Sequence, residues 1–221
     1  MKAMILAAGR GTRMGKDSLS IPKPLTKVNK KTLIEINIKK IKDAGIKDII
    51  INVSWLGDQI IEYLGDGKKF GVNLIYSNES QKLLGTGGGI NNALKLIGSK
   101  PFWLINSDVY STYKINKDFK LEKGKLCHLI LVKNPPHNKT GDFNLEGNKI
   151  IYNKDEKNYT FSGISVLSPK IFAYRKNKVF ALEPLLKNLA KKDKVTGEYY
   201  DNFWIDVGTK RRLGILKKFL K

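Results

Sequence analysis

Cysteine is nearly absent from this sequence. The single residue of this type, Cys127, excludes an internal disulfide framework and is typical of proteins that work in a reducing cytoplasm. Cys127 lies in the apolar run LCHLILV, so we interpret it as a small core residue and not as a nucleophile.

Long apolar runs are absent as well. No run approaches the roughly 20 apolar residues that a membrane-spanning helix needs. The first residues, MKAMILAAG, hold too short an apolar segment for a signal peptide and continue directly into glycines. We therefore expect neither a membrane span nor a secretory leader. The 221 residues, 41% of them hydrophobic, are enough for one large globular domain with a sizeable core.

Arginine is scarce although the chain is strongly basic. The formal net charge is +21, yet only five of the 41 basic residues are arginine. Arginine is the residue best suited to reading bases and phosphates, and the lysines are scattered without forming a basic arm. We therefore expect no nucleic-acid partner and keep a basic nucleic-acid-binding protein only as an alternative. The positive field would still concentrate an anionic substrate.

Histidine is also rare. The two histidines, His128 and His137, are predicted in a strand and in a loop, and neither is paired with a nucleophile. This argues against a hydrolytic triad. We expect the three tryptophans to be core aromatics; they are Trp55, Trp103 and Trp204.

Apolar runs and helical patterns alternate through the first half of the chain. Strands are predicted at residues 3–8, 46–55, 72–77, 101–106 and 126–134. A helix is predicted from Thr32 to a stop at Gly45, because Thr32 and Glu35 have capping-box spacing. Further helices are predicted over residues 56–64 and from the glycine cluster 85–89 into 90–98. This alternation predicts an α/β fold with a parallel, helix-covered sheet.

The second half has a different pattern. A hairpin is predicted to turn at Gly147 and Asn148, and a strand at 159–168 precedes a helix start at Pro169. A helix at 181–192, an extended segment at 198–208 and a terminal helix at 209–221 follow. No linker or repeat divides the chain. We therefore predict one domain whose second half forms a lid or substrate-binding lobe on the same sheet.

The polar loop from residue 9 to residue 24 has the features of a phosphate site. Gly9 and Gly11 let the backbone approach a ligand and direct N–H groups at anionic oxygens. Arg13 and Lys23 add charges suited to a triphosphate, and the prolines on both sides of Lys23 stiffen its backbone. The spacing matches neither a Walker loop nor a Rossmann fingerprint. The alternative is a simple turn between a strand and a loop.

Two aspartates are candidate metal ligands. Asp108 follows a predicted strand, at the end of the sheet where ligands bind in open α/β folds. Asp206 is flanked by apolar residues, and burial of its charge is costly unless a cation or donor compensates it. Two carboxylates together with substrate phosphates match the sparse protein ligation that Mg²⁺ prefers. The alternative for Asp108 is a helix cap.

Several motifs together resemble the sugar-1-phosphate nucleotidyltransferases. The most specific is LAAGRGTRM followed by PKPL, and further landmarks follow in the family's order up to about residue 213. They are INVSWLGDQI, TGGGI, NSDV, GDFNL, FSGISVL, LEPLL and WIDVGTKRRL. The motifs are most similar to the branch that transfers a uridylyl group from UTP to N-acetylmuramate 1-phosphate in peptidoglycan recycling. The resemblance implies one domain over residues 1–221, with a three-layer α/β/α fold and a Rossmann-like, mostly parallel mixed sheet.

The resemblance also implies roles for the residues at matching motif positions. The UTP-binding positions would be Gly11, Thr12, Arg13, Lys23, Thr86 and Gly87. Arg13, Lys23 and Asp108 would be catalytic, and Asp108 with Asp206 would bind Mg²⁺. Asn106 and Asp142 would contact the sugar 1-phosphate. Residues 1–134 would form the nucleotide-binding half, and residues 135–221 would bind the sugar and complete the metal site.

Other functions remain compatible with these motifs. A sibling enzyme could transfer a uridylyl, thymidylyl or guanylyl group to a hexose 1-phosphate. A nucleotide-sugar sensor is a non-catalytic alternative, but a sensor does not need to keep the metal site. The motifs imply no protein partner.

Overall fold

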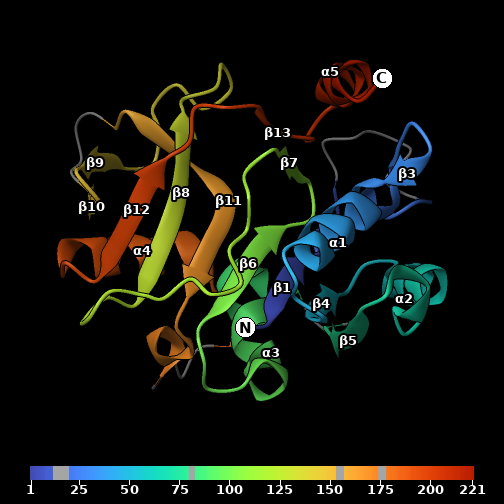
Figure 1. Cartoon of the computed structure of the whole chain (residues 1–221), viewed down its shortest axis with the longest axis horizontal. Coiled ribbons are helices and arrows are strands. Elements are labelled where there is room, and N and C mark those ends of the chain that lie inside the picture. Colours follow the sequence, from blue (N-terminus) through green and yellow to red (C-terminus); the bar gives the residue numbers. More distant parts are fainter. Residues whose placement is uncertain (12–19, 80–82, 153–156, 174–177) are drawn as a thin grey trace.

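The computed structural model describes residues 1–11, 20–79, 83–152, 157–173 and 178–221 (Figure 1). The predicted roles of Thr12 and Arg13 concern positions outside these described residues.

A nine-stranded mixed sheet forms the centre of the fold. Its order is β5 (Asn73–Asn78), β4 (Asp48–Val53), β1 (Ala3–Leu6), β6 (Phe102–Asn106), β11 (Tyr159–Leu167), β8 (Cys127–Lys133), β12 (Val195–Tyr199), β10 (Lys149–Ile151) and β9 (Asn144–Glu146). The four strands from β5 to β6 are parallel, and so are β8 and β12. The other neighbours are antiparallel. The first four strands of this order come from residues 1–106, and strands from the rest of the chain extend the same sheet on the side of β6.

Helices cover both faces of the sheet. Along β1, Ala3 and Ile5 point to one face and Met4 to the other, as the alternation of a strand requires. The first face packs against α1 (Leu33–Asp43) and α2 (Gly57–Leu64). The second face packs against α3 (Gly85–Ile97) and α4 (Leu182–Lys191). The predicted α/β/α arrangement with a Rossmann-like mixed sheet is confirmed.

Smaller elements lie around the sheet. The strand β7 (Val109–Ser111) pairs with β13 (Trp204–Asp206), and β2 (Lys27–Val28) pairs with β3 (Lys31–Thr32). Short 3₁₀ turns are η3 (Lys23–Leu25), η4 (Lys68–Phe70) and η5 (Pro169–Phe172). The helix α5 (Lys210–Phe219) ends the chain beside β13 (Figure 1).

Most predicted elements are present, with two differences. The capping box at Thr32 begins α1 as predicted, with both of its hydrogen bonds formed. The segment after Pro169 is a 3₁₀ turn and not an α-helix. The predicted extended segment 198–208 is divided between β12, which begins earlier at Val195, and β13 in another sheet.

The aromatic predictions hold for two of the three tryptophans. Trp103 is fully buried in the core, and Trp204 is half-buried and donates its indole N–H to the Ser162 carbonyl at 2.9 Å. The prediction for Trp55 was wrong, because its side chain is 38% exposed. Trp55 follows β4 at the edge of the sheet, where it lies under an arginine described below.

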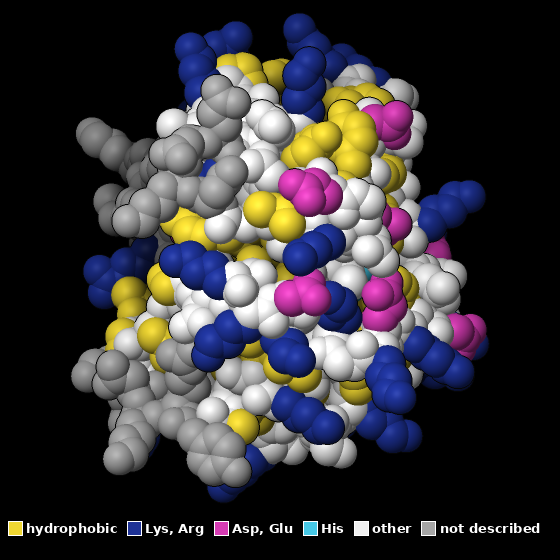
Figure 2. Space-filling model, turned by 90° about the vertical axis from the view of Figure 1, so that its left-hand side faces the viewer, with side chains coloured by type: hydrophobic (Ala, Val, Ile, Leu, Met, Phe, Trp, Pro, Cys, Tyr) yellow, Lys and Arg dark blue, Asp and Glu magenta, His cyan; other side chains and the backbone are white. Residues whose placement is uncertain are grey.

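Charged side chains are spread over the surface. On the face shown in Figure 2, lysines and arginines are separated by acidic, apolar and uncharged groups. Among the described residues, every helix is too short or too polar to span a bilayer.

The burial of Cys127 in the core can be tested by labelling its thiol. Its side chain has no exposure, and burial raises the pKa of its thiol, so little nucleophilic thiolate forms. We expect the native protein to resist labelling by a thiol reagent at mildly alkaline pH, and the protein in denaturant to react at one thiol. Rapid labelling of the native protein would contradict this burial.

Candidate functional site

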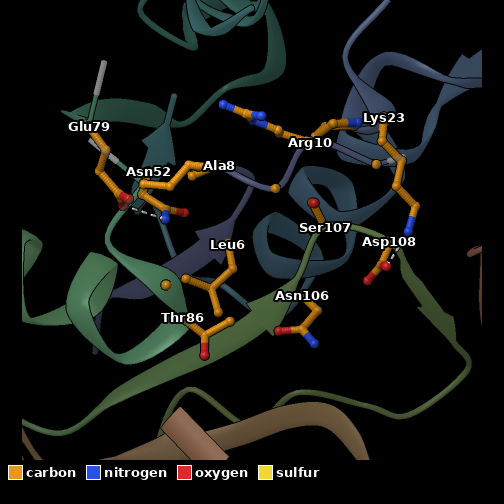
Figure 3. Close-up of a pocket in the computed structure, with 15 residues that line it drawn as sticks. Leu6, Ala8, Arg10, Lys23, Asn52, Glu79, Thr86, Asn106, Ser107 and Asp108 are labelled. Atoms are coloured by element: carbon orange, nitrogen blue, oxygen red, sulfur yellow. Dashed lines mark hydrogen bonds and ion pairs between the residues drawn. The ribbon is translucent and has the colours of Figure 1, made fainter. Parts of the chain in front are cut away.

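A cavity of about 570 Å³ opens at the carboxyl ends of the four parallel strands (Figure 3). Glu79 follows β5, Asn52 is near the end of β4, and Asn106 ends β6. The backbone after β1, from Ala8 to Gly11, lies between them. Parallel strands end at the same edge of a sheet, so residues distant in sequence meet here.

Lys23 and Asp108 form an ion pair at one side of this cavity. The Lys23 ammonium donates to Asp108 Oδ2, and Lys23 is only 9% exposed (Figure 3). Gly11 allows this position, because it has a φ of +64° and a Cβ there would lie 2.8 Å from the Lys23 Cβ. The predicted glycine, lysine and aspartate are therefore brought together.

Arg10 contributes a second cation, which the sequence analysis did not assign to the site. Its side chain lines the cavity, and its guanidinium carbon lies 5.6 Å from the centre of the Trp55 ring. A cation over an aromatic face is stabilised electrostatically. This contact explains why Trp55 lies at the surface, and it could have been suspected only from the tertiary structure.

Glu79 and Asn52 form the opposite side of the cavity from Lys23 and Asp108 (Figure 3). Glu79 is 5% exposed and accepts hydrogen bonds from the Asn52 amide at 2.8 Å and the Leu84 backbone at 3.4 Å. Burial raises the pKa of the Glu79 carboxyl, and these two hydrogen bonds partly oppose the shift. Glu79 was not predicted from the sequence, although its place directly after a parallel strand was a signal.

Asp206 lies beside Asp108 because β13 pairs with β7. Asp206 is opposite Val109 in this pairing, and the Val207 N–H donates to the Asp108 carbonyl at 2.7 Å. The pKa of Asp206 is raised, mainly by burial and further by the Asp108 charge. The two predicted metal ligands thus come from distant parts of the chain to one place.

Two basic side chains approach Asp206 from other elements. His137 Nε2 lies 3.0 Å from Asp206 Oδ1, and Arg212 Nη1 lies 3.2 Å from the same oxygen. Arg212 and His137 lower the pKa of Asp206 and partly offset the effect of burial. Neither residue was predicted from the sequence to belong to the site.

The chemistry of this pair of carboxylates fits a divalent cation. Asp206 Oδ1 is buried and, apart from its contacts with His137 and Arg212, completes no hydrogen bond with the described residues, so the carboxylate retains acceptor capacity. Among those residues, no group of three or more histidines, cysteines or carboxylates is placed to hold a metal. A cation here would therefore share two carboxylates and take its remaining ligands from water and substrate, as Mg²⁺ commonly does.

The glycine cluster at the start of α3 packs closely on the segment before α4. The N–H groups of Gly87 and Gly88 donate to the Phe180 carbonyl at 3.0 and 3.1 Å. A Cβ at Gly87 would lie 2.4 Å from the Phe180 ring. Thr86 lines the large cavity, whereas Gly87 is not among the residues that line it.

A smaller cavity of about 210 Å³ adjoins the first. The two share Leu6, Thr86 and Asn106, and Asp142 lines the smaller one. Asp142 is held by the Phe161 N–H at 2.8 Å and the Asn138 amide at 3.2 Å. The predicted pair Asn106 and Asp142 therefore faces one compartment that continues into the larger cavity.

Asn37 on α1 supports the backbone around Asp108. It is 3% exposed, and its amide donates to the carbonyls of Ser107 at 3.3 Å and Val109 at 3.2 Å. These are the residues on either side of Asp108, so the helix fixes the turn from which the carboxylate projects.

Known proteins with similar sequences and structures share this arrangement of elements. A family described as nucleotidyl transferase matches residues 2–220. The chain is 41% identical to N-acetylmuramate alpha-1-phosphate uridylyltransferase of Neisseria meningitidis serogroup B, over 96% of this chain and 95% of the relative. It is 31% identical to D-glycero-alpha-D-manno-heptose 1-phosphate guanylyltransferase of Campylobacter jejuni, over 94% of this chain and 95% of that one.

One solved structure supports the comparison in three dimensions. HddC from Yersinia pseudotuberculosis, complexed with GMP-PN, has a TM-score of 0.81 and 25% sequence identity. The superposition covers 100% of this chain and 99% of that one.

Removal of the Asn37 amide tests whether this side chain stabilises the backbone on either side of Asp108. We expect Asn37→Leu to lower the free energy of unfolding by about 1–3 kcal/mol, because two buried carbonyls lose a donor. Urea denaturation measures this change, with Asn202→Leu as a control at an exposed asparagine. Equal stabilities of the two variants would contradict the role of Asn37.

Proposed function

The chain belongs to the nucleotidyltransferase family, and we propose that it transfers a uridylyl group from UTP to a sugar 1-phosphate. The observation that carries this proposal is the meeting of Lys23, Asp108 and Asp206 at one edge of the sheet. We propose N-acetylmuramate 1-phosphate as the sugar, on the basis of the relative with 41% identity. The reaction would then belong to peptidoglycan recycling in the cytoplasm.

The proposed reaction needs no protein base. A phosphate oxygen of the sugar 1-phosphate attacks the α-phosphorus of UTP, and a new P–O bond forms there. The bond between the α-phosphorus and its bridging oxygen breaks, and pyrophosphate leaves with the electron pair. The nucleophile is ionised at neutral pH, so catalysis consists of positioning and charge neutralisation.

Lys23 is proposed to stabilise negative charge on the α-phosphate and the leaving pyrophosphate. Its stem packs against Gly11 and its ammonium is held by Asp108, which limits the reorganisation needed during the reaction. Gly11 would bind the phosphates through its backbone. Thr12 and Arg13 keep their proposed phosphate-binding role, with Arg13 also catalytic.

Asp108 and Asp206 are proposed to hold Mg²⁺. When bound, the ion would neutralise charge on the reacting phosphates. The supporting observation is a pair of adjacent carboxylates, one of them with a buried oxygen that, apart from its contacts with His137 and Arg212, completes no hydrogen bond within the described structure.

The smaller cavity is proposed to take the sugar. Asn106 and Asp142 would contact the sugar 1-phosphate, and Thr86 would lie between the sugar and nucleotide compartments. Gly87 does not line the large cavity, so its proposed place in the nucleotide site would be beside Thr86, against the Phe180 ring. In this proposal residues 1–134 bind the nucleotide, and residues 135–221 bind the sugar together with Asn106 of the first half.

Glu79 is proposed to contact the base at the far end of the large cavity. A carboxylate accepts the imide N–H of uracil, whereas cytosine presents an acceptor at the equivalent ring nitrogen. Guanine also presents N–H donors on its base-pairing edge. Guanylyl transfer is therefore the second candidate, and the Campylobacter relative with 31% identity acts as a guanylyltransferase.

The choice of nucleotide can be tested by pyrophosphate release with N-acetylmuramate 1-phosphate, Mg²⁺ and each nucleoside triphosphate. We expect UTP to be preferred, and Glu79→Ala to reduce the selectivity for UTP over CTP by about tenfold, which corresponds to one polar contact. Glu62→Ala removes an exposed carboxylate as the control. A preference for GTP would replace uridylyl by guanylyl transfer, and an unchanged selectivity would contradict the role of Glu79.

The catalytic assignment predicts the effect of removing either member of the ion pair. We expect Lys23→Ala and Asp108→Asn each to lower kcat by about 10²–10³, since each removes charge at the reacting phosphates. Steady-state kinetics measures the loss, and a cooperative thermal transition checks folding. Lys30→Ala, at an exposed lysine, is the matched control. Near-normal turnover in either variant would show that the assignment is wrong.

A further inference from the structure

The turn between β13 and α5 brings an arginine back to Asp206. Asp206 ends β13, and α5 begins four residues later, with Thr209 as its N-cap. The Thr209 hydroxyl accepts from the Arg212 N–H at 3.3 Å, which places Arg212 in the first turn of the helix. A short turn and a capped helix therefore fix the backbone that carries both charges.

The Arg212 guanidinium and the Asp206 carboxylate are shielded from solvent. Their side chains are 12% and 19% exposed, and Nη1 lies 3.2 Å from Oδ1. An ion pair at this depth is screened less by solvent than a surface pair. The orientation of the carboxylate therefore depends on this neighbour.

Gly208 provides independent support for the position of the guanidinium. A Cβ on Gly208 would lie 2.0 Å from Arg212 Nη2 and 3.2 Å from its Cζ. Gly208 is not among the described glycines with positive φ, so its conformation does not require glycine. The space that a side chain would fill is occupied by Arg212.

His137 approaches the same carboxylate from the loop between β8 and β9. Both His137 and Arg212 contact Oδ1, at 3.0 and 3.2 Å. Two basic side chains from separate segments thus contact one oxygen of the carboxylate. Arg212 comes from the same turn as Asp206, so it can act on the carboxylate before any substrate is present.

We propose that Arg212 is a positioning residue that keeps the Asp206 carboxylate turned toward the divalent cation shared with Asp108. Because Gly208 has no side chain, there is room for the guanidinium. The proposal rests on the metal role assigned to Asp206 above. Groups that hold a metal ligand from behind commonly contribute about 10- to 100-fold to metal affinity.

Mn²⁺ binding tests this role without turnover. The full-length protein is titrated with Mn²⁺, alone and with UTP but without sugar phosphate, and free Mn²⁺ is measured by electron paramagnetic resonance. We expect Arg212→Ala to weaken Mn²⁺ binding about tenfold and Arg212→Lys to weaken it less. Millimolar guanidinium should restore part of the affinity of Arg212→Ala, which a general loss of structure would not allow.

Gly208→Ala separates positioning from stability. The added methyl group would clash with the end of a flexible arginine and would lie at an ordinary contact distance of 3.6 Å from Asp206 Oδ2, so the guanidinium moves while its charge is retained. We expect a melting temperature close to that of the unmodified protein and a loss of Mn²⁺ affinity similar to that of Arg212→Ala. This variant also preserves the test if Arg212→Ala fails to fold.

Two controls distinguish failure of the proposal from failure of the proposed function. Arg211→Ala removes an exposed arginine one position away and should leave Mn²⁺ affinity unchanged. Asp206→Asn should weaken Mn²⁺ binding, and if it does not, the metal site itself is wrong. Weak binding in Asp206→Asn with normal affinity in Arg212→Ala and Gly208→Ala would overturn the positioning role alone.

Discussion

Two partly buried carboxylates impose the main constraint on this protein. Asp108 and Asp206 lie next to each other, and burial of like charges is costly unless cations compensate it. Lys23 pairs with the first, and Arg212 and His137 approach the second. Each of these basic side chains comes from a different segment. Compensation of the carboxylate charges therefore requires segments that are distant in sequence to lie together.

Close packing at this site is possible because several positions lack a side chain. Gly11 accommodates the Lys23 stem, and Gly208 accommodates the Arg212 guanidinium. Gly163 has a φ of +80°, and a Cβ there would lie 2.7 Å from the Asn106 amide. In each case the glycine stands behind a polar side chain that the proposed function uses.

The architecture was predictable because local patterns encode it. The capping box at Thr32, the apolar strand of residues 101–106 and the turn at Gly147 depend on neighbours in sequence. Carboxylates directly after strands could be identified in the same way, since parallel strands end at a common edge. Glu79 has this signature and could have been found by the same reasoning.

Other members of the site could not be found from local patterns. Nothing near Arg212 in the sequence indicates that a capped turn returns it to Asp206. His137 lies in a polar loop, and only the fold places it 3.0 Å from the same oxygen. Tryptophan is usually a core residue, but Trp55 is exposed after the end of a strand and lies beneath Arg10.

Patterns within the sequence therefore predicted most strands and helices, the family, and the residues proposed for the phosphate and metal chemistry. These properties follow from hydrophobic periodicity, capping and motif spacing, which are local. Tertiary structure alone decided which cation faces each carboxylate and which glycine makes room for it. The reason is physical: electrostatic compensation and steric fit depend on distances between atoms that the chain separates by up to 85 residues, as for Lys23 and Asp108.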